Sequence, residues 1–208
     1  MSAVLDLRLF SEVFITLFVI MDPPGIVPMF LGLTSSMTSK QRKRAARQAI
    51  LVSFGVICSF AIFGQQLLNY MHITLAALQA SGGLLLLLIA MELLTGKSEE
   101  PAPSGNAGVN VAMVPLGTPL LAGPGAIVAI MVAVQGSSGT APAWVAISLA
   151  VVAVHVCLWL AMRFSNVIRR VLRDSGTILF TRIAGLLLSA IAVQMIANSV
   201  RAFVTTGS

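Results

Sequence analysis

The sequence has few charged residues and few residues that could perform chemistry. Of its 208 residues, 10% are charged and 57% are hydrophobic, whereas about 25% are charged in a typical soluble domain. It contains only two cysteines and two histidines. This composition excludes an ordinary soluble domain and indicates an integral membrane protein.

The reactive residues are too scattered to form common catalytic or metal sites. Cys58 and Cys157 both fall within apolar runs, where we expect buried thiols rather than a disulfide framework. The sequence has no His-Glu-x-x-His zinc motif, no serine nucleophile elbow and no phosphate-binding glycine loop. We therefore expect no enzymatic activity, no metal ion and no cofactor. Any transport would be driven by an ion gradient or by the gradient of the substrate itself.

Long apolar stretches predict the fold class. A helix needs about 20 residues to cross a hydrocarbon core about 30 Å thick. Six stretches meet this length: Leu9 to Leu33, Ala45 to Asn69, Ile73 to Thr95, Val111 to Val134, Pro142 to Met162 and Ile178 to Phe203. They are too long and too uniformly apolar for barrel strands, so we predict an all-α membrane protein with six transmembrane helices.

The first and fourth of these spans contain helix breaks. Proline removes a backbone donor and clashes with the preceding turn, and glycine gives up helical order easily. The first span contains Asp22-Pro23-Pro24-Gly25, and the fourth contains Gly123-Pro124-Gly125 shortly after Gly117-Thr118-Pro119. The Pro-Gly pairs of the two breaks are 100 residues apart. This spacing indicates one feature used twice.

A second correspondence supports an internal repeat. The stretch from Gly83 to Ala90 resembles that from Gly185 to Ala192, 102 residues later. Three spans in each half are an odd number, so the second half must enter the membrane in the opposite orientation. We predict a first three-helix repeat over residues 1–96, a flexible cytoplasmic linker over 97–110 and a second, inverted three-helix repeat over 111–208.

The distribution of basic residues predicts the orientation. Of the 13 lysine and arginine residues, all but Arg8 and Arg201 fall in loops on one side of the predicted spans. By the positive-inside rule these basic loops are cytoplasmic and both termini lie outside. We attribute the net charge of +6 to contact with membrane lipids, and we expect no binding of nucleic acid.

Broken helices leave backbone groups at membrane depth that need partners. The half-helices that begin near Gly25 and Gly125 would direct positive N-terminal ends inward and could receive a carboxylate. The halves that end near Met21 and Leu121 would offer carbonyl oxygens to an ammonium group or a cation. The breaks together therefore suit a zwitterion.

Several polar residues near the breaks have two interpretations. Asp22 could cap its half-helix, or it could bind substrate or a proton, which makes it the candidate for ion coupling. Thr118 could bond back to its own helix or contact a ligand. His155 could shuttle a proton, but we favour a histidine satisfied by a neighbouring carbonyl.

Three blocks of the sequence closely resemble the MarC family of bacterial inner-membrane proteins. They are Met21 to Phe30, Val114 to Ile127 and Thr181 to Leu188. This family is also called the neutral amino acid transporter family and includes the SnatA-like carriers. The resemblance implies two inverted three-helix repeats with discontinuous first and fourth helices, and a small neutral amino acid such as glycine or alanine bound at the breaks. It also implies coupling to a proton. Sodium is the alternative coupling ion that we keep open.

The function expected from the resemblance is secondary transport across the bacterial inner membrane. The residues expected to bind substrate are Asp22, Pro23, Pro24, Gly25, Gly117, Thr118, Gly123, Pro124 and Gly125. The alternative function is a non-transporting membrane scaffold or assembly subunit in which the breaks only aid packing. The sequence leaves open whether copies of the chain form a homo-oligomer.

Overall fold

The computed structural model describes residues 6–34, 37–95, 121–137 and 139–206. Every regular element within these ranges is an α-helix, as expected for an all-helical protein. The helices of the described part are α1 (Leu7–Met21), α2 (Ile26–Leu33), α3 (Ser39–Tyr70), α4 (Leu75–Thr95), α5 (Pro124–Gly136), α6 (Ala141–Arg163) and α7 (Ser165–Thr206). The predicted linker, residues 97–110, lies outside the described residues.

Four described helical segments are long and apolar enough to cross a membrane: α3, α4, α6 and the part Ile178–Thr205 of α7. Helices α1 and α2 form a fifth candidate span, bent by 45° at the predicted first break. Helix α5 has 13 residues and is too short to cross alone. Residues 111–120, predicted as the start of the fourth span, are not among those described, so the sixth span remains a prediction.

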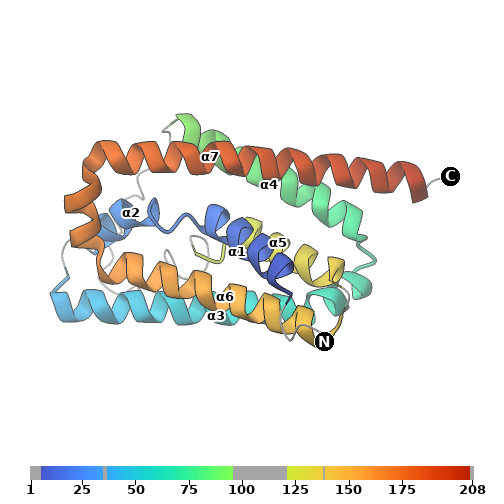
Figure 1. Cartoon of the computed structure of the whole chain (residues 1–208), viewed down its shortest axis with the longest axis horizontal. Coiled ribbons are helices and arrows are strands. Elements are labelled where there is room, and N and C mark those ends of the chain that lie inside the picture. Colours follow the sequence, from blue (N-terminus) through green and yellow to red (C-terminus); the bar gives the residue numbers. More distant parts are fainter. Residues whose placement is uncertain (1–5, 35–36, 96–120, 138, 207–208) are drawn as a thin grey trace.

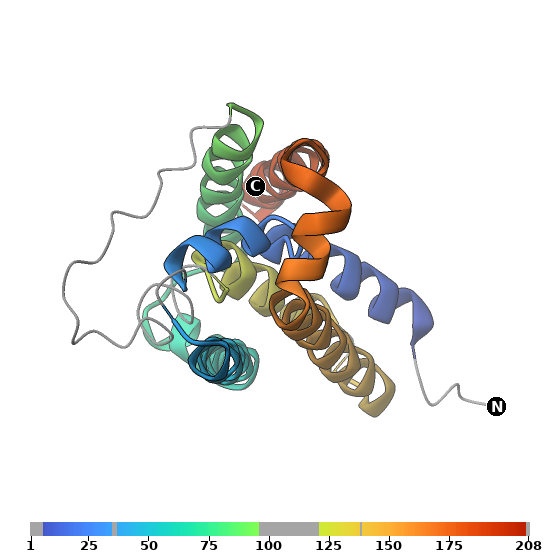
Figure 2. The same cartoon turned by 90° about the vertical axis from the view of Figure 1, so that its left-hand side faces the viewer.

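The helices pack in layers (Figures 1 and 2). Helices α4 and α7 lie side by side and antiparallel along one side of the bundle, and α3 and α6 do the same along the other. Helices α1, α2 and α5 lie between these pairs. A continuous core joins the middle layer to α3 and α6 through Leu17, Ile57, Ile130 and Leu158, each at most 1% exposed. This arrangement places the helix breaks inside the bundle.

Two helices begin within segments that the sequence suggested were basic loops. Helix α3 starts at Ser39 because Thr38 and Gln41 form a capping box, in which each side chain accepts from the other residue's backbone N–H at 3.3 and 2.9 Å. Helix α7 starts at Ser165 and bends before its membrane-crossing part (Figure 1). The expectation of a loop between the fifth and sixth spans is therefore wrong. That segment is rich in arginine and lacks proline, which favours a helix.

Contacts between α3 and α6 and between α4 and α7 involve residues that are 102 positions apart. The Ser53 hydroxyl lies 3.2 Å from His155 Nε2, and these two residues are 102 positions apart. The other ring nitrogen of His155 lies 2.8 Å from the carbonyl oxygen of Val151. This geometry confirms the interpretation of His155 as a histidine satisfied by a neighbouring carbonyl.

Glycines allow α4 and α7 to approach closely in the same reciprocal way. A Cβ atom on Gly83 would lie 2.9 Å from the carbonyl oxygen of Ala192. A Cβ atom on Gly185 would lie 3.3 Å from the carbonyl oxygen of Ala90. The two glycines are 102 positions apart, and so are the two alanines. In the first contact the glycine belongs to α4 and the alanine to α7, and in the second contact the reverse is true.

Replacing Gly83 by alanine is expected to lower the free energy of unfolding by about 1–3 kcal/mol, because overpacking would push the α7 backbone away. Thermal unfolding of the detergent-purified protein measures this loss. Gly55→Ala is the control, since a Cβ atom on Gly55 meets nothing within 4 Å. Equal stability of the two variants would contradict the close approach of α4 and α7.

Candidate functional site

The first break starts at the end of α1. Asp22 takes up a left-handed backbone conformation, with φ of 38° and ψ of 68°, and its N–H donates to the carbonyl oxygen of Phe18 at 3.1 Å. Pro23 and Pro24 follow, neither of which has a backbone N–H. Helix α2 begins at Ile26. The chain therefore turns within four residues, as the sequence predicted.

The Asp22 carboxylate uses only one of its oxygens. Oδ1 accepts a hydrogen bond from the Gly25 N–H at 3.2 Å, so the side chain does cap the break. Oδ2 is buried and has no hydrogen-bond partner, and the whole residue is 8% exposed. No lysine or arginine in the described part of the chain pairs with it. An unpaired acid at this depth is costly, and such groups commonly serve binding or ion coupling.

The two prolines also leave backbone oxygens at the end of α1 without partners. In a regular helix the carbonyls of Val19 and Ile20 would accept from the residues four positions on, but these are the prolines. The carbonyl of Met21 would accept from the Gly25 N–H, which bonds to Asp22 instead. No hydrogen bond among the described residues ends on these three carbonyls. Together with Asp22 Oδ2 they form a group of unpaired acceptors.

Thr181 of α7 borders the same break, and sequence reasoning did not identify it as a site residue. A Cβ atom on Gly25 would collide with the Asp22 carboxylate and would lie 3.1 Å from Thr181 Oγ1. Gly25 has an ordinary φ of −69°, so this position needs glycine for space rather than for its backbone angle. The only sequence signal for Thr181 was its place at the start of a block that resembles the MarC family.

The described part of the second break includes a backbone donor at the start of α5. Gly123 is extended, with φ of −61° and ψ of 163°, and its carbonyl oxygen accepts from the N–H groups of Ala126 and Ile127 at 3.0 and 3.1 Å. Pro124 has no N–H, and the Gly125 N–H finds no acceptor among the described residues. Within the described residues, the start of α5 therefore presents an unpaired donor at the positive end of a helix.

Other predicted features of the second break cannot be placed. Gly117 and Thr118 lie outside the described residues, so both interpretations of Thr118 stay open. Within the described ranges, no three histidine, cysteine, aspartate or glutamate side chains are grouped so that they could hold a metal ion.

The two breaks are neighbours in the folded chain. A Cβ atom on Gly125 would lie 3.4 Å from Ile20 in the last turn of α1 and would collide with Leu86 of α4. Leu121 and Ala122, which precede α5, belong to the same buried cluster as Met21. The last turn of α1 and the start of α5 are thus in contact within the buried core.

Comparison with known proteins places these features in a family. A family model described as MarC family integral membrane protein matches residues 7–204. A Methanocaldococcus jannaschii protein, UPF0056 membrane protein MJ1677, is 35% identical over 202 residues, covering 95% of this chain and 98% of its own. UPF0056 membrane protein YhcE of Escherichia coli is 32% identical over 206 residues, covering 94% of each chain. UPF0056 membrane protein YvbG of Bacillus subtilis is 32% identical over 192 residues, covering 89% of this chain and 90% of its own. No solved structure matches the chain significantly.

Proposed function

Because the chain belongs to the MarC family of integral membrane proteins, we propose that it is a secondary transporter of small neutral amino acids such as glycine and alanine. In this proposal, transport is coupled to protons, with sodium as the alternative ion, and proceeds by alternating access at the two helix breaks. The names of these relatives say only that they are membrane proteins. The proposal therefore depends on the geometry of the breaks.

The observation that carries the proposal is the opposite polarity of two neighbouring helix ends. The end of α1 offers the unpaired carbonyls and Asp22 Oδ2, which suit the three N–H donors of an ammonium group. The start of α5 offers the Gly125 N–H and the positive end of the helix dipole, which suit a carboxylate. An amino acid carries both groups on adjacent carbon atoms.

The crowding at the breaks supports a small substrate. Neither Gly25 nor Gly125 has room for a Cβ atom, and Asp22, Leu121 and Ala122 are at most 8% exposed. A substrate with a large side chain would need a much larger rearrangement than glycine or alanine. A bulky apolar drug does not suit a site built from backbone groups and one carboxylate.

Proton coupling is assigned to Asp22. It is the one acid at the breaks among the described residues, and the equivalent position of the second break is the neutral Ala122. Protonation would remove its charge and weaken its hold on the ammonium group. His155 is a weaker candidate, because both of its ring nitrogens already contact Ser53 and Val151.

In this proposal, the two inverted repeats move relative to each other during transport. In the predicted repeat, α1 corresponds to α5 and α3 corresponds to α6. The repeat therefore predicts that a contact of α1 with α6 is matched by a contact of α3 with α5, and both pairs of helices are in contact. The contacts of Ser53 with His155 and of the α4 and α7 glycines follow the same exchange. These relations support the predicted six spans and a rocking motion of one repeat against the other.

The basic end of the bundle is assigned to the cytoplasmic side of a bacterial inner membrane. Arg42 and Lys43 of α3 lie at the same end of the bundle as Arg163 of α6, since all three line one cavity. Helix α7 ends at the opposite end of the bundle (Figure 1). The positive-inside rule then places the termini outside.

Thermal unfolding of the purified protein with a panel of amino acids tests the proposed substrate class. A ligand that binds only the folded state at one hundred times its Kd stabilises the protein by about 2.7 kcal/mol. We expect glycine and alanine to raise Tm, and leucine, glutamate and lysine to leave it unchanged. A panel in which no amino acid raises Tm would favour the membrane scaffold.

Thr181→Val is expected to weaken alanine binding by about 2–10-fold, since one neutral hydrogen bond contributes about 0.5–1.5 kcal/mol. Valine keeps the shape of threonine but lacks the hydroxyl that lies beside Gly25 and Asp22. Titration of the purified variant with alanine measures the loss. Thr95→Val is the control, because that hydroxyl bonds to the Met91 carbonyl within its own helix. Equal affinity of Thr181→Val and the parent protein would exclude Thr181 from the site.

A further inference from the structure

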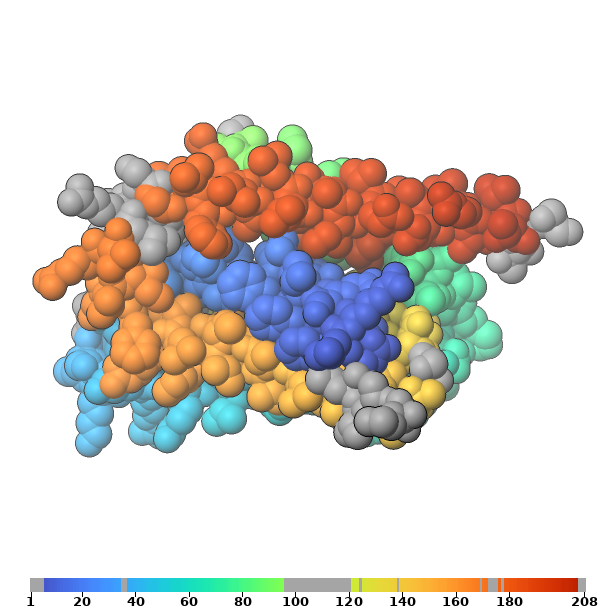
Figure 3. All heavy atoms as spheres, viewed as in Figure 1, coloured from blue at the N-terminus to red at the C-terminus, as the bar shows by residue number. Residues whose placement is uncertain are grey.

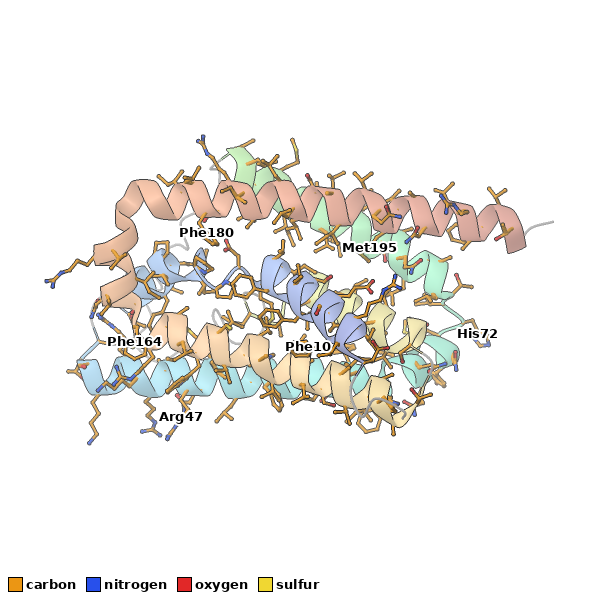
Figure 4. The ribbon with its side chains drawn as sticks, viewed as in Figure 1. Phe10, Arg47, His72, Phe164, Phe180 and Met195 are labelled. Carbon is orange, nitrogen blue, oxygen red and sulfur yellow. The ribbon has the colours of Figure 1, made fainter. Side chains whose placement is uncertain are left out.

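A cavity of about 150 Å³ opens at the basic end of the bundle, lined by residues distinct from those of the helix breaks. It lies between the start of α3, the end of α6 and the start of α7. These three helix ends are at the left in Figures 3 and 4. Its polar lining consists of Ser39, Arg42, Lys43, Arg163, Ser165 and Asn166. This volume holds several water molecules, so a phosphate group fits.

Arg42 is the best-fixed cation among the residues that line this cavity. Its Nη2 donates to the carbonyl oxygen of Thr34 at the end of α2, at a distance of 3.1 Å. This bond fixes the guanidinium between α2 and α3. Nε of the same side chain is buried and has no hydrogen-bond partner. A buried charged donor without an acceptor is costly, so the position calls for an acceptor that the described residues do not supply.

The other two cations of the cavity have no counter-charge among the described residues. No ion pair joins Lys43 or Arg163 to a carboxylate in this part of the chain. The guanidinium of Arg163 lies over the ring of Phe164, 5.5 Å from its centre. Three cations around one cavity repel one another, and an anion between them would relieve that repulsion.

Two hydrophobic side chains next to the cavity in sequence are exposed. Phe164 is 47% exposed and Val167, in the first turn of α7, is 57% exposed. Met37 and Met162 contribute to the cavity wall. Charged groups that line the cavity, with exposed hydrophobic side chains next to them, match an amphipathic ligand better than a purely soluble anion.

We propose that this cavity binds the phosphate group of an anionic membrane phospholipid, with the acyl chains lying along the exposed side chains of Phe164 and Val167. Arginine and lysine are the usual partners of phosphate, and basic pockets between helices at the cytoplasmic side suit lipid headgroups. The hydroxyls of Ser39 and Ser165 supply neutral donors. This site is separate from the proposed transport site, and neither depends on the other.

Native mass spectrometry of the detergent-purified full chain tests the lipid site. The protein is titrated with phosphatidylglycerol and, separately, with phosphatidylcholine of the same chain length, at one ionic strength. We expect phosphatidylglycerol to bind at least about tenfold more tightly, and Arg42→Gln and Arg163→Gln each to remove most of that preference. Arg163→Gln does not disturb the bond to Thr34, so it separates lipid binding from any loss of folding.

Arg47→Gln is the matched control. It makes the same change of charge on α3, but Arg47 is exposed, does not line the cavity and points away from the bundle (Figure 4). An equal loss in Arg47→Gln, or equal binding of both lipids, would overturn the proposal.

Inorganic phosphate is the second probe. If it displaces phosphatidylglycerol, the phosphate group is what the cavity recognises. If phosphate binds and the lipid does not, the lipid assignment is overturned.

Discussion

Asp22→Asn is expected to weaken alanine binding by about 10–150-fold, because a hydrogen bond to a charged group contributes about 1.5–3 kcal/mol. Asparagine keeps the oxygen that caps Gly25 and tolerates the left-handed backbone that Asp22 adopts with φ of 38°. The change therefore removes the charge and the proton-accepting oxygen while the turn persists. Transport by the variant should also lose its dependence on pH, measured as uptake into liposomes at a series of pH values.

Asp6→Asn is the control for this variant. Asp6 also caps a helix, accepting from the Leu9 N–H at 3.0 Å, but it lies at the exposed start of α1. Its replacement should change neither affinity nor pH profile. If Asp22→Asn likewise leaves both unchanged, Asp22 is a structural cap and takes no part in coupling.

Gly125→Val is expected to reduce alanine uptake to background. The new side chain would collide with Leu86 and crowd Ile20, and it would lie beside the Gly125 N–H, which has no acceptor among the described residues. Overpacking of this kind costs about 1–3 kcal/mol, which most folded proteins tolerate. The variant should therefore stay folded and lose binding. Alanine titration and thermal unfolding of the same preparation measure the two effects separately.

Gly136→Val is the matched control for that variant. It places the same side chain on α5, but a Cβ atom on Gly136 meets nothing within 4 Å. Normal uptake by Gly136→Val and none by folded Gly125→Val would support the site. Normal uptake by both would show that the start of α5 does not bind the substrate, and would favour the interpretation of the breaks as packing devices.

The first helix break could be predicted from sequence because its causes are local. Two prolines and a glycine within four residues cannot continue a helix, whatever packs around them. Asp22 was recognised because an acid within an apolar run is rare. The sequence could not decide between capping and binding, since that depends on where each carboxylate oxygen points. The structure shows one oxygen capping and the other unpaired.

Features that depend on tertiary contacts could not be predicted. Thr181 is 159 positions from Asp22 and reaches the break only because α7 packs beside α1 and α2. The basic segment after Arg163 looked like a loop because its charges interrupt the apolar pattern. It is helical because arginine and leucine favour helix even where the apolar run ends. The cavity around Arg42 likewise combines residues from three helices.

Uptake of labelled alanine into liposomes that contain the purified protein, with and without an imposed proton gradient, tests transport most directly. Saturable uptake that the gradient stimulates, and that unlabelled glycine inhibits, is the result expected for a coupled carrier of small neutral amino acids. Folded protein that takes up neither alanine nor glycine in either condition would contradict transport of these substrates through the two breaks.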